Sequence, residues 1–205
     1  MSSRDHWEKV YATKAPDGVS WYAPHLARSL ALIEATGVGP DDAIIDVGGG
    51  ASTLVDDLLD RGHRRVTVLD LSQHAIDVAR ERLGDRAARV DWRVADVTRA
   101  DLPDATYAVW HDRAVFHFLT DPEQRARYVA QVRRSVLPGG HVIVATFGPE
   151  GPEKCSGLDV VRYSDDTLHA EFGPAFVKVG SATERHVTPW GSAQEFVYCY
   201  CRVTD

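Results

Sequence analysis

The chain has 205 residues, of which 44% are hydrophobic and 26% charged, and its formal net charge is −7. This composition fits one soluble globular domain that buries roughly 70% of its unfolded surface. The basic residues are scattered, which argues against nucleic acid as a partner, and no apolar run approaches the ~20 residues of a membrane span.

The N-terminus and the cysteines constrain location and chemistry. No apolar core of signal-peptide length follows Met1, so we expect a cytoplasmic protein without membrane contact, either a monomer or a weak homodimer. The chain has only three cysteines, Cys155, Cys199 and Cys201, and a small, odd number does not indicate a disulfide framework. Cys199 and Cys201 share one face of a predicted strand, which indicates core packing. The spacing matches no metal-site pattern, and we predict no metal.

Two helices and an aromatic segment between them are predicted at the N-terminus. The first helix starts at Ser3 and runs to about Tyr11. Residues 12–22 are irregular because they contain proline and glycine among their aromatic residues. The second helix is expected from Pro24, since proline is favoured at the first helical position. We interpret residues 1–23 as a lid over a cofactor or substrate.

Strands and helices then alternate through the centre of the chain. Apolar runs predict strands at 43–47, 65–69, 90–95, 106–111 and 141–147. Helices are predicted at 53–61, at 72–84, briefly around 115–119, and from Asp121 to Val136. Repeated strand–helix units of this length indicate a parallel sheet with helices on both faces.

The last quarter of the chain has a different pattern. A helix capped by Ser164 precedes two long strands, 176–188 and 193–203, which are separated only by the turn at 189–192. So short a connection forces antiparallel pairing. We therefore predict an α/β fold in a single domain spanning 1–205. Its sheet is doubly wound, mostly parallel and seven-stranded, with one antiparallel strand near the edge.

The ligand site is expected where the parallel strands end, because open sheets bind ligands outside their carboxyl ends. This rule gathers the glycine turn Gly48-Gly49-Gly50, Asp70, Asp96 and a turn at His111-Asp112-Arg113. Glycine tolerates positive φ and lets a ligand approach the backbone. A carboxylate at Asp70 can accept both ribose hydroxyls of an adenosine. Alternatively, it caps the next helix together with Ser72.

Several motifs favour one family over other nucleotide-binding folds. A dinucleotide fold needs G-x-G-x-x-G, but counting from Gly48 the third glycine is replaced by Thr53. Residues 46–52 fit the pattern D-x-G-x-G-x-G, with serine at its last position. Ala95-Asp96-Val97 fits an adenine-reading motif. Residues 136–140 fit the pattern L-x-P-G-G. With these motifs the chain resembles the class I S-adenosylmethionine-dependent methyltransferases along nearly its whole length.

The resemblance implies the cofactor and its contacts. S-adenosyl-L-methionine, released as S-adenosyl-L-homocysteine, is expected to contact Trp21, Asp46, Gly48, Gly49, Gly50, Asp70, Leu71, Ala95, Asp96, Val97, His111 and Arg113. In this arrangement Asp46 orients the turn and the cofactor amine, Asp70 holds the ribose, and Asp96 accepts a hydrogen bond from the adenine amino group.

Two branches of the family share further features with the chain. Residues 110–116 and the aromatic N-terminus resemble the thiopurine S-methyltransferases and small protein-lysine methyltransferases that act on elongation factors. Both branches have an aromatic N-terminal segment that closes over the cofactor. The resemblance implies a small-molecule or protein side-chain acceptor, with the accepting atom open.

The reaction implied is in-line attack on a sulfonium methyl, so the protein chiefly aligns the reactants and excludes water. A general base is needed only for a protonated nucleophile. His111 is the candidate base, although it could instead line the pocket. Asp112 and Arg113 form either an ion pair or the wall around the methionine end. The candidate substrate residues are Tyr22, His117, His186 and Trp190.

Three functions remain open on the sequence. The first is an enzyme that methylates a small molecule or a protein side chain. The second is a non-catalytic S-adenosylmethionine-binding module acting with a protein partner. The third is a nicotinamide oxidoreductase, which Thr53 and the final hairpin disfavour.

Overall fold

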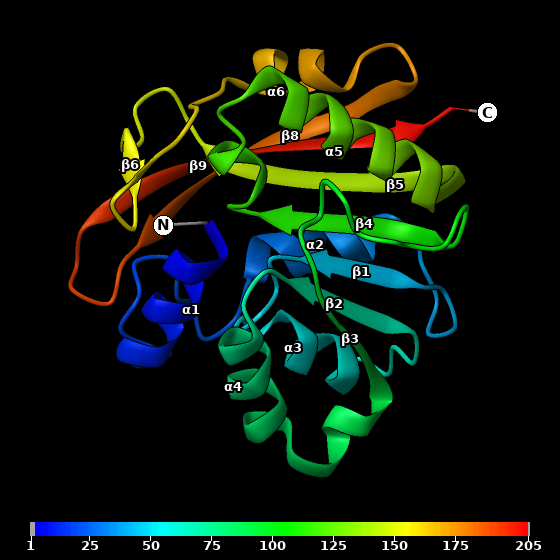
Figure 1. The fold of residues 1–205 in the computed structure, drawn as a ribbon. Coiled ribbons are helices and arrows are strands. Elements are labelled where there is room, and N and C mark those ends of the chain that lie inside the picture. The colour runs from blue at the N-terminus through cyan, green and yellow to red at the C-terminus, as the bar shows by residue number, and fades with distance from the viewer. Residues whose placement is uncertain (1–2, 205) are drawn as a thin grey trace.

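The computed structural model describes residues 3–204, and its strands form one main sheet. The sheet has seven strands in the order β3-β2-β1-β4-β5-β9-β8 (Figure 1). These strands are β1 (Ile44–Val47), β2 (Val66–Asp70), β3 (Val90–Val94), β4 (Tyr107–Arg113), β5 (Val136–Phe147), β8 (Phe176–Val187) and β9 (Ala193–Val203). β9 pairs antiparallel with both β5 and β8, whereas β1 to β5 pair in parallel. The predicted mostly parallel seven-stranded sheet is confirmed.

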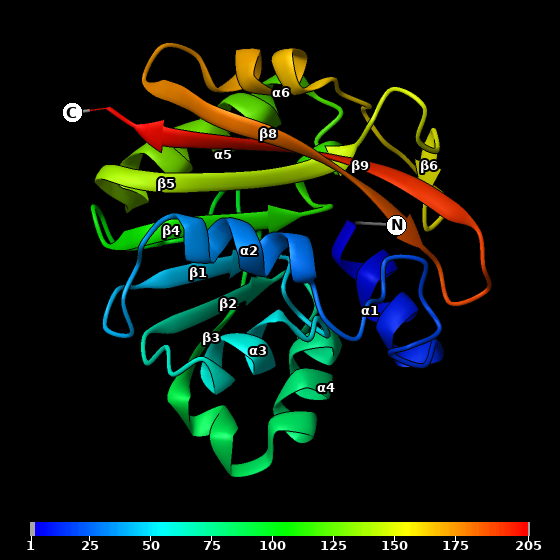
Figure 2. The same ribbon diagram turned by 180° about the vertical axis from the view of Figure 1, so that it is seen from behind.

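Helices cover both faces of this sheet. They are α1 (Ser3–Thr13), α2 (Ala27–Ala35), α3 (Leu54–Asp60), α4 (Gln73–Leu83), α5 (Pro122–Ser135) and α6 (Asp165–Phe172), with short 3-10 turns at Gly84–Arg89 and Phe116–Phe118. α5 and α6 cover one face, and α2 and α3 cover the other (Figures 1 and 2). Within residues 3–204, no helix has the length and apolar content that crossing a membrane requires.

Each face has its own apolar core. Tyr128 and Val132 of α5 pack with Phe172 of α6 against the sheet on one side. Leu30 of α2 and Leu58 of α3 pack against the other. The predicted apolar stripes therefore face the sheet, as amphipathic helices require.

Several element ends differ from the prediction. α2 begins at Ala27 rather than Pro24. β4 continues through Arg113, so His111-Asp112-Arg113 is not a turn; the chain turns at Ala114, whose φ is +74°. Pairing of Arg113 with Ala145 of β5 extends β4, an effect that no local pattern encodes.

The carboxyl ends of the parallel strands are covered by two segments from opposite ends of the chain. α1 and the segment that follows it lie beside the carboxyl end of β4 in both views (Figures 1 and 2). A small hairpin of β6 (Lys154–Cys155) and β7 (Leu158–Asp159) lies at the same edge of the sheet. The site is built between these segments and the strand ends.

Candidate active site

Two adjoining cavities lie at this edge of the sheet. The larger has a volume of about 350 Å³ and the smaller about 40 Å³. The residues that line both are Tyr11, Trp21, Val47, Gly48 and Arg113. The larger volume lies within the range of small-molecule sites.

The glycine turn forms the floor because side chains are sterically excluded there. Gly48 has a φ of +70°, and a Cβ at this position would collide with Val115. A Cβ at Gly49 would collide with the Asp46 carboxylate, and one at Gly50 with Asp70. Gly48 and Gly49 line the cavities with backbone atoms alone, and the turn lies close to two carboxylates.

Asp70 ends β2 with its carboxylate held by the backbone. Gly50 N donates to Oδ2 at 3.1 Å, and Ser72 N donates to Oδ1 at 2.8 Å. Burial raises the pKa of Asp70 to about 6, although both amides favour its ionised form. Each oxygen keeps a lone pair that can accept from a ligand hydroxyl in the larger cavity. Ser72 caps α4 by accepting from Ala75 N, so the capping role considered for this region is confirmed, and ribose binding by Asp70 stays a prediction.

Asp46 and Arg113 supply opposite charges to the smaller cavity. Asp46 Oδ2 and Arg113 Nη2 are buried, and neither has a hydrogen-bond partner within the described residues 3–204. The rest of the Arg113 guanidinium is fixed: Nε donates to Tyr198 Oη at 3.2 Å and Nη1 to Trp21 O at 3.2 Å. Buried polar atoms without partners are costly, so a ligand that supplied one positive and one negative group would satisfy both.

His111 is fully engaged by its neighbours. Its Nδ1 lies 2.7 Å from Asp46 Oδ1, and its Nε2 lies 2.8 Å from Ser29 Oγ. An ionised carboxylate only accepts, so Nδ1 carries a proton and donates to Asp46, while Nε2 is hydrogen-bonded to the Ser29 hydroxyl. His111 therefore lines the smaller cavity as a fixed side chain.

Asp112 faces the opposite side of the sheet from Arg113, because strand side chains alternate. Its carboxylate accepts from Tyr128 Oη at 2.6 Å and from Val115 N at 2.9 Å. Arg113 instead lies 3.6 Å from Glu184. The Asp112–Arg113 ion pair considered from the sequence is absent, and Asp112 shapes the turn that carries Val115.

The residues that the motifs predict to contact adenine lie along the larger cavity, whose lining includes Leu71, Ala95, Asp96 and Val97. Asp96 accepts from Thr98 N and Oγ1 through Oδ1 alone, at 2.9 and 2.8 Å. Its Oδ2 makes no hydrogen bond within residues 3–204 and is available to a donor on a ligand.

Aromatic side chains from distant segments form the outer wall of the larger cavity. Trp7 packs edge-on against Trp21 and Phe118, with ring centroids 5.7 and 5.1 Å apart. The ring centroids of Tyr11 and Trp21 lie 6.3 Å apart. Burial raises the pKa of the Tyr11 hydroxyl, so it stays protonated and can donate. Cys155 completes this wall, and burial raises its pKa to about 12, which keeps it a thiol.

Three of the candidate substrate residues line neither cavity. His117 is buried, accepts from Phe147 N at 3.3 Å, and burial lowers its pKa to about 3. His186 is bonded to Ser20 O at 2.7 Å. Trp190 is 60% exposed at the tip of the β8–β9 hairpin. Tyr22 alone of this group lines a cavity, the smaller one.

Sequence reasoning did not assign Phe118, Ser29 or Tyr198 to the site. Ser29 and Tyr198 fix His111 and Arg113, but they come from α2 and β9, and no local pattern links these elements. The described residues 3–204 contain no cluster of three metal-binding side chains. Cys199 and Cys201 have their sulfurs 3.3 Å apart and are buried in the α6-side core.

Comparisons with known proteins support a single class. Residues 44–140 match the family model described as a methyltransferase domain. The chain is 29% identical over 149 residues to the eEF1A lysine and N-terminal methyltransferase of Mus musculus. This match covers 70% of the chain but only 21% of that relative's length.

Solved structures share the fold at low sequence identity. One is the N-methyltransferase NodS from Bradyrhizobium japonicum bound to S-adenosyl-L-homocysteine, with a TM-score of 0.75, 15% identity and full coverage of both chains (100% and 100%). Another is a complex of the Haloferax volcanii Trm112 methyltransferase activator with a putative methyltransferase, with a TM-score of 0.79, 16% identity and coverage of 100% and 98%.

Proposed function

The chain carries a class I S-adenosylmethionine-dependent methyltransferase domain, and from this premise we propose that it transfers a methyl group to an amine on a protein side chain or a small molecule. The resemblance found in the sequence motifs is confirmed at the level of the family. The acceptor and the individual residue roles are part of the proposal.

One observation supports the cofactor site above the others: Asp46 and Arg113 line the same cavity, and each has a buried polar atom, Oδ2 and Nη2, without a hydrogen-bond partner among residues 3–204. An amino acid presents an ammonium and a carboxylate, which would pair with Asp46 and Arg113 respectively. Asp70 would accept from the ribose hydroxyls, and Asp96 from the adenine amino group. Gly48 lines both cavities, so the middle of the cofactor would pass along the glycine turn.

When bound, S-adenosylmethionine supplies an electrophilic methyl group on a sulfonium sulfur. The protein's own contribution is alignment and exclusion of water. Trp7, Trp21 and Phe118 supply apolar walls against which a cationic or methylated amine can pack. Because only the free amine has a lone pair to attack the methyl group, a protonated acceptor first loses its proton to solvent. Both His111 nitrogens are occupied, so we assign it to orientation of Asp46 rather than to proton removal.

An amine acceptor is favoured by this aromatic wall and by the name of the Mus musculus relative, a lysine and N-terminal methyltransferase. The relative is much longer than the chain, so its substrate is carried over here only as a proposal. The predicted lid is 1–23, of which residues 1 and 2 lie outside the described residues, and its described part supplies Trp7, Tyr11 and Trp21 to the site.

Binding is tested by thermal unfolding with S-adenosylhomocysteine. A ligand at 100 times its dissociation constant stabilises the folded state by roughly 2.7 kcal/mol. We expect an upward shift in Tm, and none with nicotinamide dinucleotides. Release of S-adenosylhomocysteine is then measured over matched panels of amines, thiols and carboxylates, including lysine peptides and intact eEF1A. Turnover with thiols but not amines would contradict the proposed acceptor.

The second candidate is a binding module that acts with a protein partner. The Haloferax volcanii structure is a complex with an activator. On this chain β8 is the outermost strand of the sheet, with Val177 and Val179 55% and 52% exposed. Cofactor binding without turnover on any acceptor, followed by turnover when a partner is added, would favour this function.

A further inference from the structure

The carboxylate of Glu8 joins α1 to the first turn of α4. Glu8 accepts four hydrogen bonds, from Ser72 Oγ at 2.9 Å, Gln73 N at 2.8 Å, and His74 N and Nδ1 at 3.1 and 2.9 Å. The first amides of a helix have no partners within the helix and favour a negative charge. Although burial opposes it, bonding to the Gln73 and His74 amides lowers the pKa of Glu8 to about 2, so the carboxylate is ionised at neutral pH.

Ser72 links this contact to the ribose carboxylate. Its hydroxyl donates to Glu8, while its backbone N donates to Asp70 Oδ1 at 2.8 Å. The same hydroxyl accepts from Ala75 N at 3.2 Å and caps α4. Glu8 therefore contacts the residue that orients Asp70, although Glu8 itself does not line either cavity.

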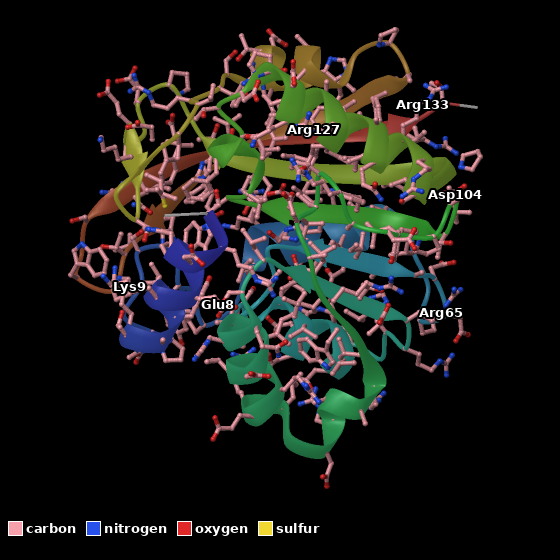
Figure 3. The ribbon with its side chains drawn as sticks, viewed as in Figure 1. Glu8, Lys9, Arg65, Asp104, Arg127 and Arg133 are labelled. Carbon is pink, nitrogen blue, oxygen red and sulfur yellow. The ribbon has the colours of Figure 1, made fainter. Side chains whose placement is uncertain are left out.

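α1 has few other buried contacts. Val10 is its only buried residue within the described range 3–204. Trp7 and Tyr11 are partly buried and belong to the aromatic wall, where both pack against Trp21. A helix of 11 residues is marginal in isolation, so its position depends on these few contacts. Figure 3 shows Glu8 on the side of α1 toward α4, with Lys9 farther out.

We propose that Glu8 is a positioning residue, which latches α1 over the larger cavity and fixes the α4 turn that presents Asp70 to the cofactor ribose. The inference rests on the proposed function. It adds that closure of the lid and occupation of the ribose site are coupled, so each favours the other.

The test compares Glu8→Ala and Glu8→Gln with the parent protein. Calorimetry measures S-adenosylhomocysteine affinity, and hydrogen exchange follows the amides of α1, Gln73 and His74. Controls are Lys9→Ala on α1 and Glu81→Ala on α4, whose exposed side chains have no hydrogen bond or ion pair within residues 3–204.

In Glu8→Ala we expect the dissociation constant to rise roughly tenfold, as is typical of coupled sites. The Gln73 and His74 amides should exchange faster, and the ligand should no longer protect α1. Glu8→Gln keeps an acceptor oxygen without the charge and should fall between Glu8→Ala and the parent. Both controls should match the parent.

The outcomes separate this inference from the proposed function. Parent-like affinity in Glu8→Ala with α1 exchanging freely would show that lid and ribose site are independent, and would overturn the inference. If Glu8→Ala does not fold, parent-like affinity and exchange in Glu8→Gln would overturn it equally. A parent protein that does not bind S-adenosylhomocysteine would overturn the proposed function instead.

Discussion

Asp46 and His111 are direct neighbours on β1 and β4, and their side chains meet with 2.7 Å between Oδ1 and Nδ1. The contact is buried, and it leaves Asp46 Oδ2 as the oxygen without a partner within residues 3–204. His111 thus holds the carboxylate in the orientation that a ligand ammonium would meet. Its second nitrogen is tied to Ser29, which fixes the ring in turn.

His111→Asn is expected to weaken cofactor binding without removing chemistry. The side-chain amide of the asparagine variant can still donate to Asp46, whereas the methyl group of the alanine variant cannot. Bonds to charged groups contribute about 1.5–3 kcal/mol, so we expect KM for the cofactor to rise roughly tenfold or more in the alanine variant, less in the asparagine variant, and kcat to change little in both. Steady-state kinetics across pH measure this. A fall in kcat of about 10²–10⁴, typical of a lost general base, would instead identify His111 as catalytic.

Arg113 and Asp70 are expected to act on different ends of the cofactor. Arg113→Lys keeps the charge but cannot reproduce the guanidinium fork. It should weaken S-adenosylhomocysteine and leave adenosine affinity unchanged. Asp70→Ala should weaken both ligands, because the ribose is common to them. Calorimetry with the two ligands measures this. Equal loss of adenosine affinity in both variants would contradict the assignment of Arg113 to the methionine end.

The sheet was predictable from the sequence because each unit carried a local signal. Apolar runs marked the strands, Ser72 and Asp121 capped their helices as predicted, and the four-residue turn at 189–192 fixed the antiparallel hairpin. The end of β4 was not predictable. Its extension to Arg113 depends on pairing with β5, a contact distant in sequence.

Some residues of the candidate site could be predicted from the sequence, and others could not. The glycine turn, Asp70 and Asp96 lie at the carboxyl ends of β1, β2 and β3, so the parallel direction of these strands places them at one edge. His117 could not be placed, because its burial under Phe147 depends on the path of a short 3-10 turn. The hydrogen bonds of Glu8 with Ser72 and Gln73 join residues more than sixty positions apart, and no local pattern predicts them.

Cofactor affinity is expected to increase with pH through the ionisation of Asp70. Burial raises its pKa to about 6, and the ionised form accepts more strongly from ribose hydroxyls. Calorimetry from pH 5 to pH 7 should show S-adenosylhomocysteine affinity rising by up to about tenfold per pH unit below that pKa. Asp70→Asn should bind weakly with little slope. A parent protein without this slope would contradict the assignment.

Asp70 also predicts how the stability of the ligand-free protein changes with pH, and here the trend is a fall with increasing pH. Burial raises the pKa values of Asp70 and Asp112 to about 6 in the folded state, against about 3.9 in an unfolded chain. The folded state then binds protons more tightly, and its stability falls as pH rises from about 4 to about 6. Urea unfolding should show this fall, and Asp70→Asn should reduce it. An unchanged pH dependence in the variant would show that Asp70 is not its source.

Gly48 gives a test of how the floor of the cavity is built. Two effects oppose a side chain there: a φ of +70° and a collision with Val115. Strain at positive φ costs about 1–2 kcal/mol, and overpacking adds about 1–3 kcal/mol. Gly37 is the matched control, because its φ is +76° and a Cβ there would meet nothing within 4 Å.

Gly48→Ala should therefore lower the free energy of unfolding by more than Gly37→Ala does, as measured with urea. In a Val115→Ala background the collision is removed, so Gly48→Ala should then cost about as much as Gly37→Ala. The difference between the two backgrounds is the coupling energy between Gly48 and Val115, expected at about 1–3 kcal/mol. No coupling would mean that Val115 does not limit this position. Gly48 would then be required for its backbone conformation alone. The contact between Gly48 and Val115, which follows the turn at Ala114, would have no part in forming the site.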